Sequence, residues 1–455
     1  MTIKVTKVSL SDAKKLLSQE ESHFNDFKAI EIKPAKLSQT ISAFANAEGG
    51  DLYIGADETP EGFSWRGYER LEDANGLIQL FEELFPLGDD FTYEFLHCDD
   101  LPGYLLHICS KKTQRIIVAS DGFPYLRRNA LKIKIDTEEK RRRLELDKGI
   151  YSFEQETVDT DLEIIEESIV MRDFLSYVIP HRSAAELIKI ELLARREKPK
   201  VAAVLLFSDL PQAAIPDRSS VKIARYKTTG EANRDALTGP AETVEGPIYS
   251  LIYDAVNRTK EIIEESRIAT SDGLIEAQYP HETLHEIITN AIIHRDYSIQ
   301  DHVHIRVFDN RIEIESPGKL AGQVTIENIL ETRAIRNGKI VRLLNKFPEP
   351  PNKDMGEGLN TAFDAMRNVK LKPPRFKETA TSFIVIIPHE RLASAQDTIL
   401  EYLERQPTIT NKQARQLYAV ETQHIMRKIL AGMVDNGLIE RVEGTQRGGV
   451  KYRKV

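Results

Sequence analysis

The feature that most constrains the fold is a helix-forming segment at residues 281–297, in which two polar side chains flank an apolar stripe. Glu286 and Asn290 are four residues apart, so both project from the same side of the predicted helix. The neighbouring side carries apolar residues at helical spacing, namely Leu284, Ile287, Ile288, Ala291 and Ile292. Because this stripe must face the core, we expect the polar pair at the rim of a cavity.

The polar pair suits a bound phosphate that carries a metal ion. A carboxylate such as Glu286 can accept a proton from water, and the amide oxygen of Asn290 can ligate Mg²⁺, which prefers oxygen ligands. On its own, such a pair is more often an ordinary polar helix surface. The order of the following segments must therefore decide between the two interpretations.

The segments after this helix follow a distinctive order. They are strands at 302–308 and 311–315, Ser316-Pro317-Gly318, a variable stretch at 319–355, Gly356-x-Gly358, a helix to about residue 369 and an apolar strand at 382–388. This order resembles the GHKL ATPases of gyrase, mismatch-repair proteins and histidine kinases. The stretches HEIITNAIIHRDYS, RIEIESPGKL, RAIRNGKI and MGEGL more closely resemble the RecG-C-terminal-like, Schlafen-associated ATP-binding proteins, over about 275–390.

The resemblance implies a GHKL (Bergerat) α/β sandwich that binds ATP and Mg²⁺. It gives Glu286 the role of activating the attacking water and Asn290 the role of holding Mg²⁺. Gly356 and Gly358 would cradle the phosphates at a helix N-terminus, where free amides and the helix dipole favour anions. The full set of cofactor-binding candidates is Asn290, His294, Ser316, Gly318, Arg336, Asn337, Gly356 and Gly358.

The adenine end of the expected site departs from the GHKL pattern. The resemblance implies that Gly318 lets adenine approach the backbone and that 319–355 is the ATP lid, with Arg336 and Asn337 as a family signature inside it. GHKL proteins generally have an Asp before the glycine to bind the adenine amino group. Here that position is Ser316, beside a glutamate. A nucleotide sensor that does not hydrolyse ATP therefore stays open.

A second set of motifs lies near the N-terminus. The stretch ESHFNDFK at 21–28 is followed by SAFANAEGG at 42–50 and LYIGAD at 52–57. A helix is expected at 35–46, ended by Gly49-Gly50. These residues resemble the Schlafen AlbA-type α/β domain over about 15–135. The resemblance implies binding of RNA or DNA, and some Schlafen proteins cut transfer RNA with three carboxylates.

Three acidic residues fall on those carboxylate positions: Glu21, Asp26 and Asp57, with Glu58 as an alternative to the last. Such a cluster could bind Mg²⁺ or Mn²⁺ and activate water for phosphodiester cleavage. Asp26 stands where Glu is usual, and its shorter side chain could weaken the geometry of a metal site. Alternatively, Asp26 and Lys28 form a structural ion pair and the domain only binds nucleic acid. We favour binding, because spacing alone does not prove the geometry of a metal centre.

The C-terminal segment, about 394–455, predicts a winged helix. Helices are expected at 396–405, 411–418 and 421–435, followed by a two-stranded ribbon. Residues 396–455 hold ten Lys and Arg and seven Asp and Glu, which gives +3 in a chain of net charge −9. Polar candidates are Thr422, Gln423, His424, Arg427 and Lys428 on the third helix and Arg447, Lys451 and Arg453 on the wing. A DNA-reading module and a protein–protein module are equally compatible with this pattern.

The remaining segment, 148–270, shows no catalytic signature. Helices are expected at 161–178 and 246–266, a buried strand at 201–207 and a weaker strand at 219–226.

The composition places limits on the kind of protein. A net charge of −9 excludes a uniformly basic protein that coats nucleic acid, so any such contact must come from local patches. Two cysteines are too few for a disulfide framework, and no stretch has the roughly 18 apolar residues of a membrane helix. The N-terminus lacks the apolar core of a signal peptide. We therefore expect a cytoplasmic protein with no membrane partner.

The sequence thus predicts an α+β multidomain protein with domains at 1–147, 148–270, 271–393 and 394–455. The predicted function is a Mg²⁺-dependent ATPase that acts on RNA or DNA under ATP control, as a homo-oligomer; by analogy, the context is stress or antiphage defence. The competing hypothesis is a non-catalytic, ATP-responsive winged-helix transcriptional regulator. A third is an ATP-dependent interaction protein with no nucleic-acid role.

Overall fold

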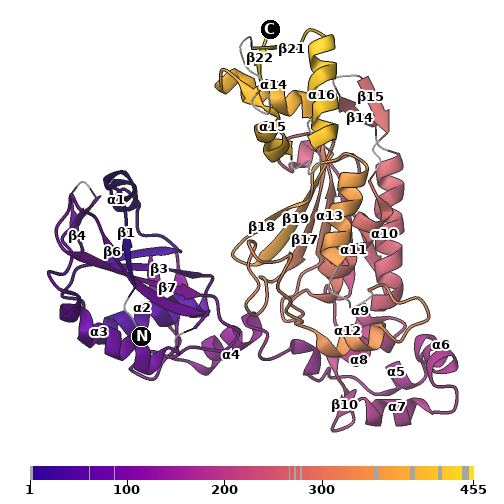
Figure 1. Cartoon of the computed structure of the whole chain (residues 1–455). Coiled ribbons are helices and arrows are strands. Elements are labelled where there is room, and N and C mark those ends of the chain that lie inside the picture. The colour runs from indigo at the N-terminus through magenta and orange to yellow at the C-terminus, as the bar shows by residue number, and fades with distance from the viewer. Residues whose placement is uncertain are drawn as a thin grey trace. The chain divides into compact units, whose positions relative to one another are not determined.

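The computed structural model describes residues 4–60, 62–86, 88–265, 267–270, 273–276, 279–352, 358–389, 395–418, 423–442 and 450–455. The chain is an α+β protein with two compact units, and each is described by itself (Figure 1). Unit 1 is Met1–Ala365 with Pro374–Pro388, and unit 2 is Met366–Pro373 with His389–Val455. Among the described helices, none has the length and apolar character needed to cross a membrane.

The N-terminal part of unit 1 is built on a five-stranded sheet in the order β1-β6-β7-β3-β2. These strands are Val5–Lys7, Phe91–His97, Tyr104–Lys111, Gly49–Ile54 and Asn25–Lys28. One face packs against α2 (Pro34–Asn46) and α3 (Asn75–Leu84), and the other against α1 (Leu10–Leu17). Smaller elements are β4 (Ala56–Thr59), β5 (Gly62–Trp65), a 3-10 turn (Leu71–Ala74), β8 (Tyr125–Arg128), β9 (Leu131–Lys134) and α4 (Glu138–Asp147).

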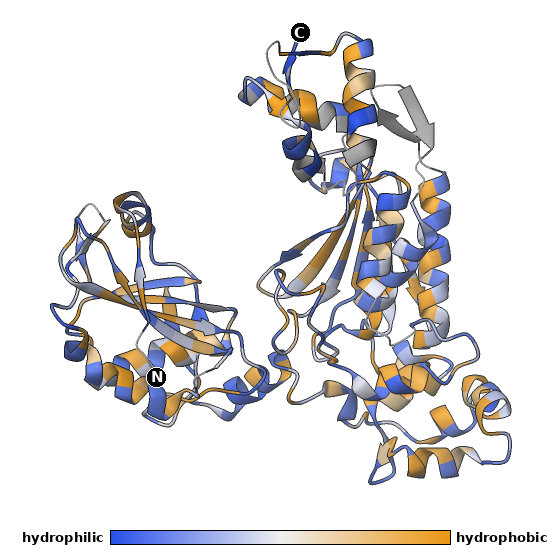
Figure 2. Cartoon of the chain, viewed as in Figure 1, coloured by the Kyte–Doolittle hydropathy of each residue, from blue (hydrophilic) through white to orange (hydrophobic). Residues whose placement is uncertain are grey.

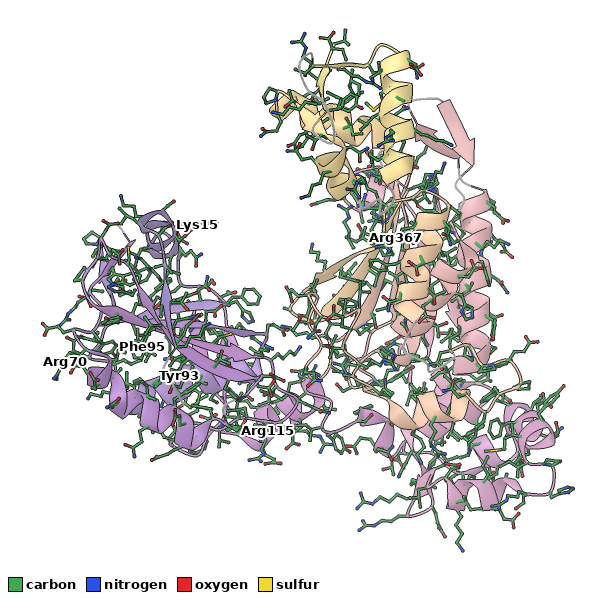
Figure 3. The ribbon with its side chains drawn as sticks, in the orientation of Figure 1. Lys15, Arg70, Tyr93, Phe95, Arg115 and Arg367 are labelled. Carbon is green, nitrogen blue, oxygen red and sulfur yellow. The ribbon has the colours of Figure 1, made fainter. Side chains whose placement is uncertain are left out.

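The side chains follow this layering. Phe95 on β6 is fully buried between sheet and helices, whereas Lys15 on α1 and Arg70 are exposed (Figure 3). Helices α3 and α10 (Ile248–Glu264) alternate hydrophobic and hydrophilic residues, as expected of helices with one buried side (Figure 2).

The stretch SAFANAEGG at 42–50, which ends the expected helix, has a structural role in this fold. Asn46 is buried, and its amide nitrogen donates to the carbonyls of Ile117 (2.7 Å) and Tyr125 (2.9 Å), while its oxygen accepts from the Ile117 amide (2.8 Å). Ser42 also donates to the Ile117 carbonyl (2.8 Å). A Cβ at Gly50 would overlap the ring of Phe44. The motif therefore fastens the segment before β8 to α2.

The segment 148–219 is mainly helical and corrects one expectation. Residues 201–207 form a buried helix, α8 (Val201–Phe207), and not a strand. A continuous apolar run has no periodicity that distinguishes a buried helix from a buried strand. The expected helix at 161–178 is two helices, because the Ser168 side chain caps a second one. The elements are a 3-10 turn (Phe153–Gln155), α5 (Glu163–Glu166), α6 (Ile169–Val178), α7 (Ala184–Ile190), β10 (Ala194–Arg195), β11 (Lys198–Pro199) and α9 (Pro211–Ala214).

The rest of unit 1 is a six-stranded sheet in the order β13-β12-β16-β17-β19-β18. Its strands are Glu242–Glu245, Ser220–Arg225, Val303–Val307, Arg311–Pro317, Ser382–Pro388 and Arg375–Glu378. Helices α10, α11 (His281–Ile293) and α13 (Gly358–Asn368) lie on one side of it (Figure 1). Strands from both sides of the boundary expected at 270 thus share one sheet. A 3-10 turn (Arg234–Ala236), β14 (Arg267–Thr270) and β15 (Gly273–Glu276) complete this region.

The expected lid, 319–355, contains a buried helix, α12 (Gly338–Leu344), that the sequence did not predict. The buried carboxylate of Glu154 accepts hydrogen bonds from the amides of Lys339 (2.8 Å) and Ile340 (2.9 Å) at its start. Helix α12 is therefore held by the core and cannot be part of a mobile lid.

Unit 2 has helices α14 (Ala395–Arg405), α15 (Asn411–Tyr418) and α16 (Gln423–Asp435) and a sheet in the order β20-β22-β21. The strands are Ile409–Thr410, Lys451–Lys454 and Ile439–Arg441. The helices agree with the expected spans, and the winged-helix assignment stays a prediction. Arg427 and Lys428 are exposed on α16, whereas Thr422, Arg447 and the side chains of Gln423 and His424 lie outside the described residues.

Replacement of Asn46 by alanine tests whether its hydrogen bonds hold the segment before β8 against α2. The Asn46→Ala protein loses the hydrogen bonds of Asn46 to the Ile117 amide and the Tyr125 carbonyl, whereas the Ile117 carbonyl keeps its hydrogen bond from Ser42. This loss should cost about 3 kcal/mol of stability in the N-terminal part. Trp65 is the only tryptophan and is buried there, so its fluorescence during urea unfolding reports on this part alone. Lys36→Ala, at an exposed site of α2, is the control. Equal urea midpoints for the two variants would contradict this role.

Candidate functional site

A cavity of about 690 Å³ lies between α11, the end of β17, the lid and the start of α13. Its volume falls in the range of roughly 300–1,000 Å³ that is typical of small-molecule sites. Among the candidates from sequence, it is lined by Glu286, Asn290, His294, Ser316, Gly318, Arg336 and Gly358. Gly356 lies outside the described residues. The structure thus brings most of the predicted nucleotide-binding residues to one cavity.

At one end of the cavity, the start of α13 lies close to α11. The Asn290 amide nitrogen donates to a Glu286 carboxylate oxygen at 2.8 Å. A Cβ at Gly358 would overlap that carboxylate, so a larger residue at the start of α13 would displace the Glu286 side chain from its present position. Burial raises the pKa of Glu286, although the hydrogen bond from Asn290 opposes this shift. The expected acid and amide therefore face the expected glycine.

The other end of the cavity is lined by cationic and imidazole groups. His294 is partly buried, and desolvation followed by the charge of Arg336 lowers its pKa to about 4, so the ring is neutral. Within the described part of the chain, its Nδ1 has no hydrogen-bond partner. Arg336 donates to the Lys319 carbonyl at 2.6 Å. A Cβ at Gly318 (φ +101°) would overlap Arg336 and Asp296, so this glycine already serves their packing.

Two of the candidate residues make structural contacts. The Ser316 hydroxyl lines the cavity and donates to the Ala291 carbonyl at 2.7 Å. Asn337 is not among the residues that line the cavity, and its amide donates to the carbonyls of Ile293 and Arg295, both at 2.9 Å, at the end of α11. Glu315, beside Ser316, is engaged elsewhere, with Arg306 at 2.6 Å.

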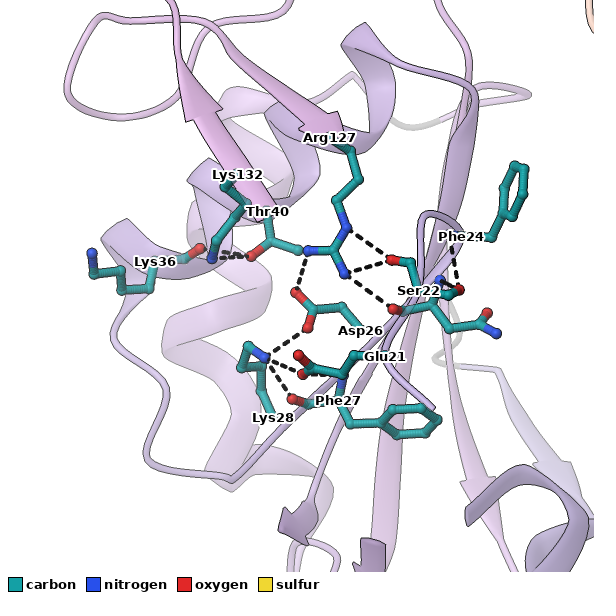
Figure 4. Close-up of polar contacts among 11 residues, drawn as sticks. Glu21, Ser22, Phe24, Asp26, Phe27, Lys28, Lys36, Thr40, Arg127 and Lys132 are labelled. Atoms are coloured by element: carbon teal, nitrogen blue, oxygen red, sulfur yellow. Dashed lines mark hydrogen bonds and ion pairs between the residues drawn. The ribbon is translucent and has the colours of Figure 1, made fainter. Parts of the chain in front are cut away.

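The N-terminal carboxylates form a compact ionic cluster with two cations (Figure 4). Lys28 contacts Glu21 at 2.6 Å and Asp26 at 2.7 Å, and Arg127 contacts the second oxygen of Asp26 at 3.2 Å. Arg127 also donates to the Ser22 carbonyl at 2.8 Å. Asp26 and Arg127 are both buried, so this pairing belongs to the interior of the domain.

The two carboxyl groups of the cluster titrate differently. Burial, and after it the hydrogen bond with Glu21, raises the pKa of Asp26. Burial opposes ionisation of Glu21 as well, but its hydrogen bonds with Asp26 and Lys28 lower its pKa to about 2.

These carboxylates do not fit a metal centre. Each oxygen of Asp26 already faces a cation, and Asp57 on β4 lies 3.7 Å from Arg66 instead. Within the described residues, no three His, Cys, Asp or Glu side chains are grouped so that they could hold a metal ion. The cluster matches the structural ion pair that the sequence left as its alternative.

Sequence reasoning missed Arg127, a member of this cluster, and Lys132, which lies near it. Lys132 on β9 donates to the Thr40 hydroxyl at 2.8 Å, and burial lowers its pKa (Figure 4). Both residues lie about a hundred positions from Glu21 in the chain, in a stretch without a motif. The one available signal in the sequence was the strand-like run YLRR, in which Arg127 shares a face with Tyr125.

Comparisons with known proteins agree with both sets of motifs. Residues 21–136 match the family "Schlafen, AlbA_2", and residues 300–387 match the family "Putative ATP-dependent DNA helicase recG C-terminal". The second match begins after α11, so the placement of Glu286 and Asn290 depends on the cavity geometry. No curated protein matches the chain.

The solved structures that match the chain include that of the DIP2311 protein from Corynebacterium diphtheriae. It is 16% identical, with 98% of this chain and 96% of that chain covered, at a TM-score of 0.41. This likeness is too low to carry a conclusion about function. The two family matches are the informative findings: the chain fuses a Schlafen AlbA-type domain to a RecG-C-terminal-like domain of the GHKL ATPase kind.

Proposed function

We propose that the chain binds Mg·ATP in the cavity, hydrolyses it with Glu286 as the general base, and binds the phosphate backbone of RNA or DNA through its N-terminal domain. The observation that carries the ATP site is the meeting of Glu286, Asn290 and Gly358 at one end of a cavity of nucleotide size. The Schlafen-type match supports the nucleic-acid role.

The residues present suit Mg·ATP. Because Asn290 donates to Glu286 through its nitrogen, its amide oxygen is left to ligate Mg²⁺. Bound Mg²⁺ would neutralise charge on the phosphates. Gly358 begins α13, whose first amides point out of the helix and favour an anion. The Ser316 oxygen, which gives its proton to a carbonyl, keeps lone pairs that can accept from the adenine amino group.

Two substitutions on α11 separate binding from hydrolysis. Asn290→Ala should weaken Mg·ATP binding at least tenfold, because it removes the metal ligand. Glu286→Gln should keep ATP affinity within about threefold but lower turnover by roughly 10²–10⁴-fold, as expected for loss of a general base. Asn257→Ala and Glu264→Gln, at exposed sites of α10, are matched controls. Calorimetric titration measures binding and ADP release measures turnover. An Asn290→Ala protein that binds like wild type would refute the site.

The raised pKa of Glu286 predicts the pH dependence of hydrolysis. A general base must be ionised, and burial raises the pKa of this carboxyl above its ordinary 4.5. Turnover should therefore fall, as the pH is lowered, at a higher pH than an exposed glutamate would give. The check is the dependence of kcat on pH at saturating Mg·ATP. A rate that stays constant down to pH 4.5 would exclude Glu286 as the base.

For the N-terminal domain we propose binding to phosphate and not metal-dependent cleavage. The ammonium group of Lys28 is occupied by Glu21, Asp26 and the Phe27 carbonyl. Lys132 donates to Thr40 alone among the described residues, so it retains donors for a phosphate oxygen. Burial lowers the pKa of this ammonium group, and a phosphate beside it would favour the charged form.

Lys132→Gln tests this assignment. Loss of one phosphate contact should weaken binding to single-stranded RNA or DNA roughly fivefold and reduce the slope of log affinity against log salt by about 0.7–0.9. Lys15→Gln, at an exposed site of α1, is the control (Figure 3). Fluorescence anisotropy at several salt concentrations gives both numbers. An unchanged slope would remove Lys132 from the interface. Strand breaks that disappear in Glu21→Gln would instead favour a nuclease.

The second candidate is an ATP-responsive transcriptional regulator. It is favoured by Arg427 and Lys428, which are adjacent and exposed on α16, as in a helix that contacts DNA. A footprint on one DNA sequence that requires unit 2, with no cleavage of RNA or DNA, would support this function.

A further inference from the structure

The lid begins with a short wall, Leu320–Val324, that closes one side of the cavity. Leu320, Ala321 and Val324 all line the cavity, directly after Gly318. The amide of Val324 donates to the Ala321 carbonyl at 3.2 Å, so this wall is a tight turn. Its shape therefore helps to set the space that is left for a ligand.

This wall is held by a side chain from the N-terminal domain. The Lys112 ammonium group, one residue beyond β7, donates to the carbonyls of Leu320 (3.0 Å) and Val324 (3.1 Å). Its third contact is the Glu48 carboxylate at 3.1 Å. An ammonium group has three donors, so all are used. The side chain is only 7% exposed, so the wall cannot shift without leaving a buried charge short of partners.

A carboxylate of the ATPase-like domain holds the same wall from the other side. The amide of Leu320 donates to Glu378 on β18 at 2.7 Å. Gly322 has φ +62°, and a Cβ at this position would lie only 3.1 Å from the Cβ of Ala334, so the turn favours glycine here. Both the amide and the carbonyl of Leu320 are thus fixed, the first by its own domain and the second by the N-terminal domain.

We propose that Lys112 is a positioning residue of the ATP site: it holds Leu320–Val324 in the conformation that forms the cavity, so the N-terminal domain completes the nucleotide pocket. This inference rests on the proposed ATP binding. A wall that is already ordered does not have to be ordered when the ligand binds, which increases affinity. Linkage is reciprocal, so bound nucleotide must strengthen the contact of Lys112 with the wall to the same degree.

The test uses the full-length protein and Mg·ATP. Lys112→Met keeps the length of the side chain but removes its donors, and should weaken ATP binding about tenfold while kcat at saturating ATP stays within twofold. Lys112→Arg keeps charge and donors and should restore most of the affinity. Lys111→Met changes the exposed neighbour and should match wild type. An affinity of Lys112→Met within twofold of wild type would overturn the proposal.

A second measurement on the wild-type protein does not depend on the folding of a variant. Mg·ATP should slow amide hydrogen exchange in peptides that cover residues 111–115, far along the chain from the nucleotide site, in addition to those that cover 320–324. Unchanged exchange at 111–115 with saturating ATP would also overturn the proposal. If the wild-type protein binds no ATP, the proposed function fails; if it binds ATP but Lys112 has no effect, only this inference fails.

Discussion

The contact of the Glu286 carboxylate with Gly358 is the constraint on which the candidate ATP site depends. It allows the first turn of α13 to approach the polar side of α11 without a Cβ between them. The two helices are also tied by the Thr283 hydroxyl, which donates to the Ala362 carbonyl at 3.0 Å. Because both helices pack on one sheet, this approach fixes one end of the cavity.

The parts of the fold that the sequence predicted are those governed by local pattern. Helix α11 has a clean apolar stripe, and the hairpin of β16 and β17 turns at an Asp-Asn pair, so periodicity and turn chemistry were sufficient. Helix α8 was wrongly expected to be a strand because every one of its residues is apolar. Helix α12 was missed because its buried residues lie in a stretch that resemblance assigned to a lid.

The parts that could not be predicted are contacts between residues far apart in the chain. Arg127 reaches Asp26 across 101 positions, and Lys112 reaches Leu320 across 208. No motif records such pairs, since each partner is an ordinary charged or backbone group in its own neighbourhood. The contact with Arg127 changes the role of Asp26 from a candidate metal ligand to a partner in an ion pair. A carboxylate that contacts both Lys28 and Arg127 has little charge left to attract a metal ion.

Several motif residues in this chain make contacts that stabilise the fold, whether or not they also contact a ligand. Asn337 closes the end of α11, and Gly318 makes room for Arg336, although both were expected to contact nucleotide. A bound ligand can use the polar groups that the fold leaves without a partner, such as the amide oxygen of Asn290 and the remaining donors of Lys132. A motif match therefore identifies the scaffold, whereas the unsatisfied polar atoms of that scaffold indicate where its chemistry takes place.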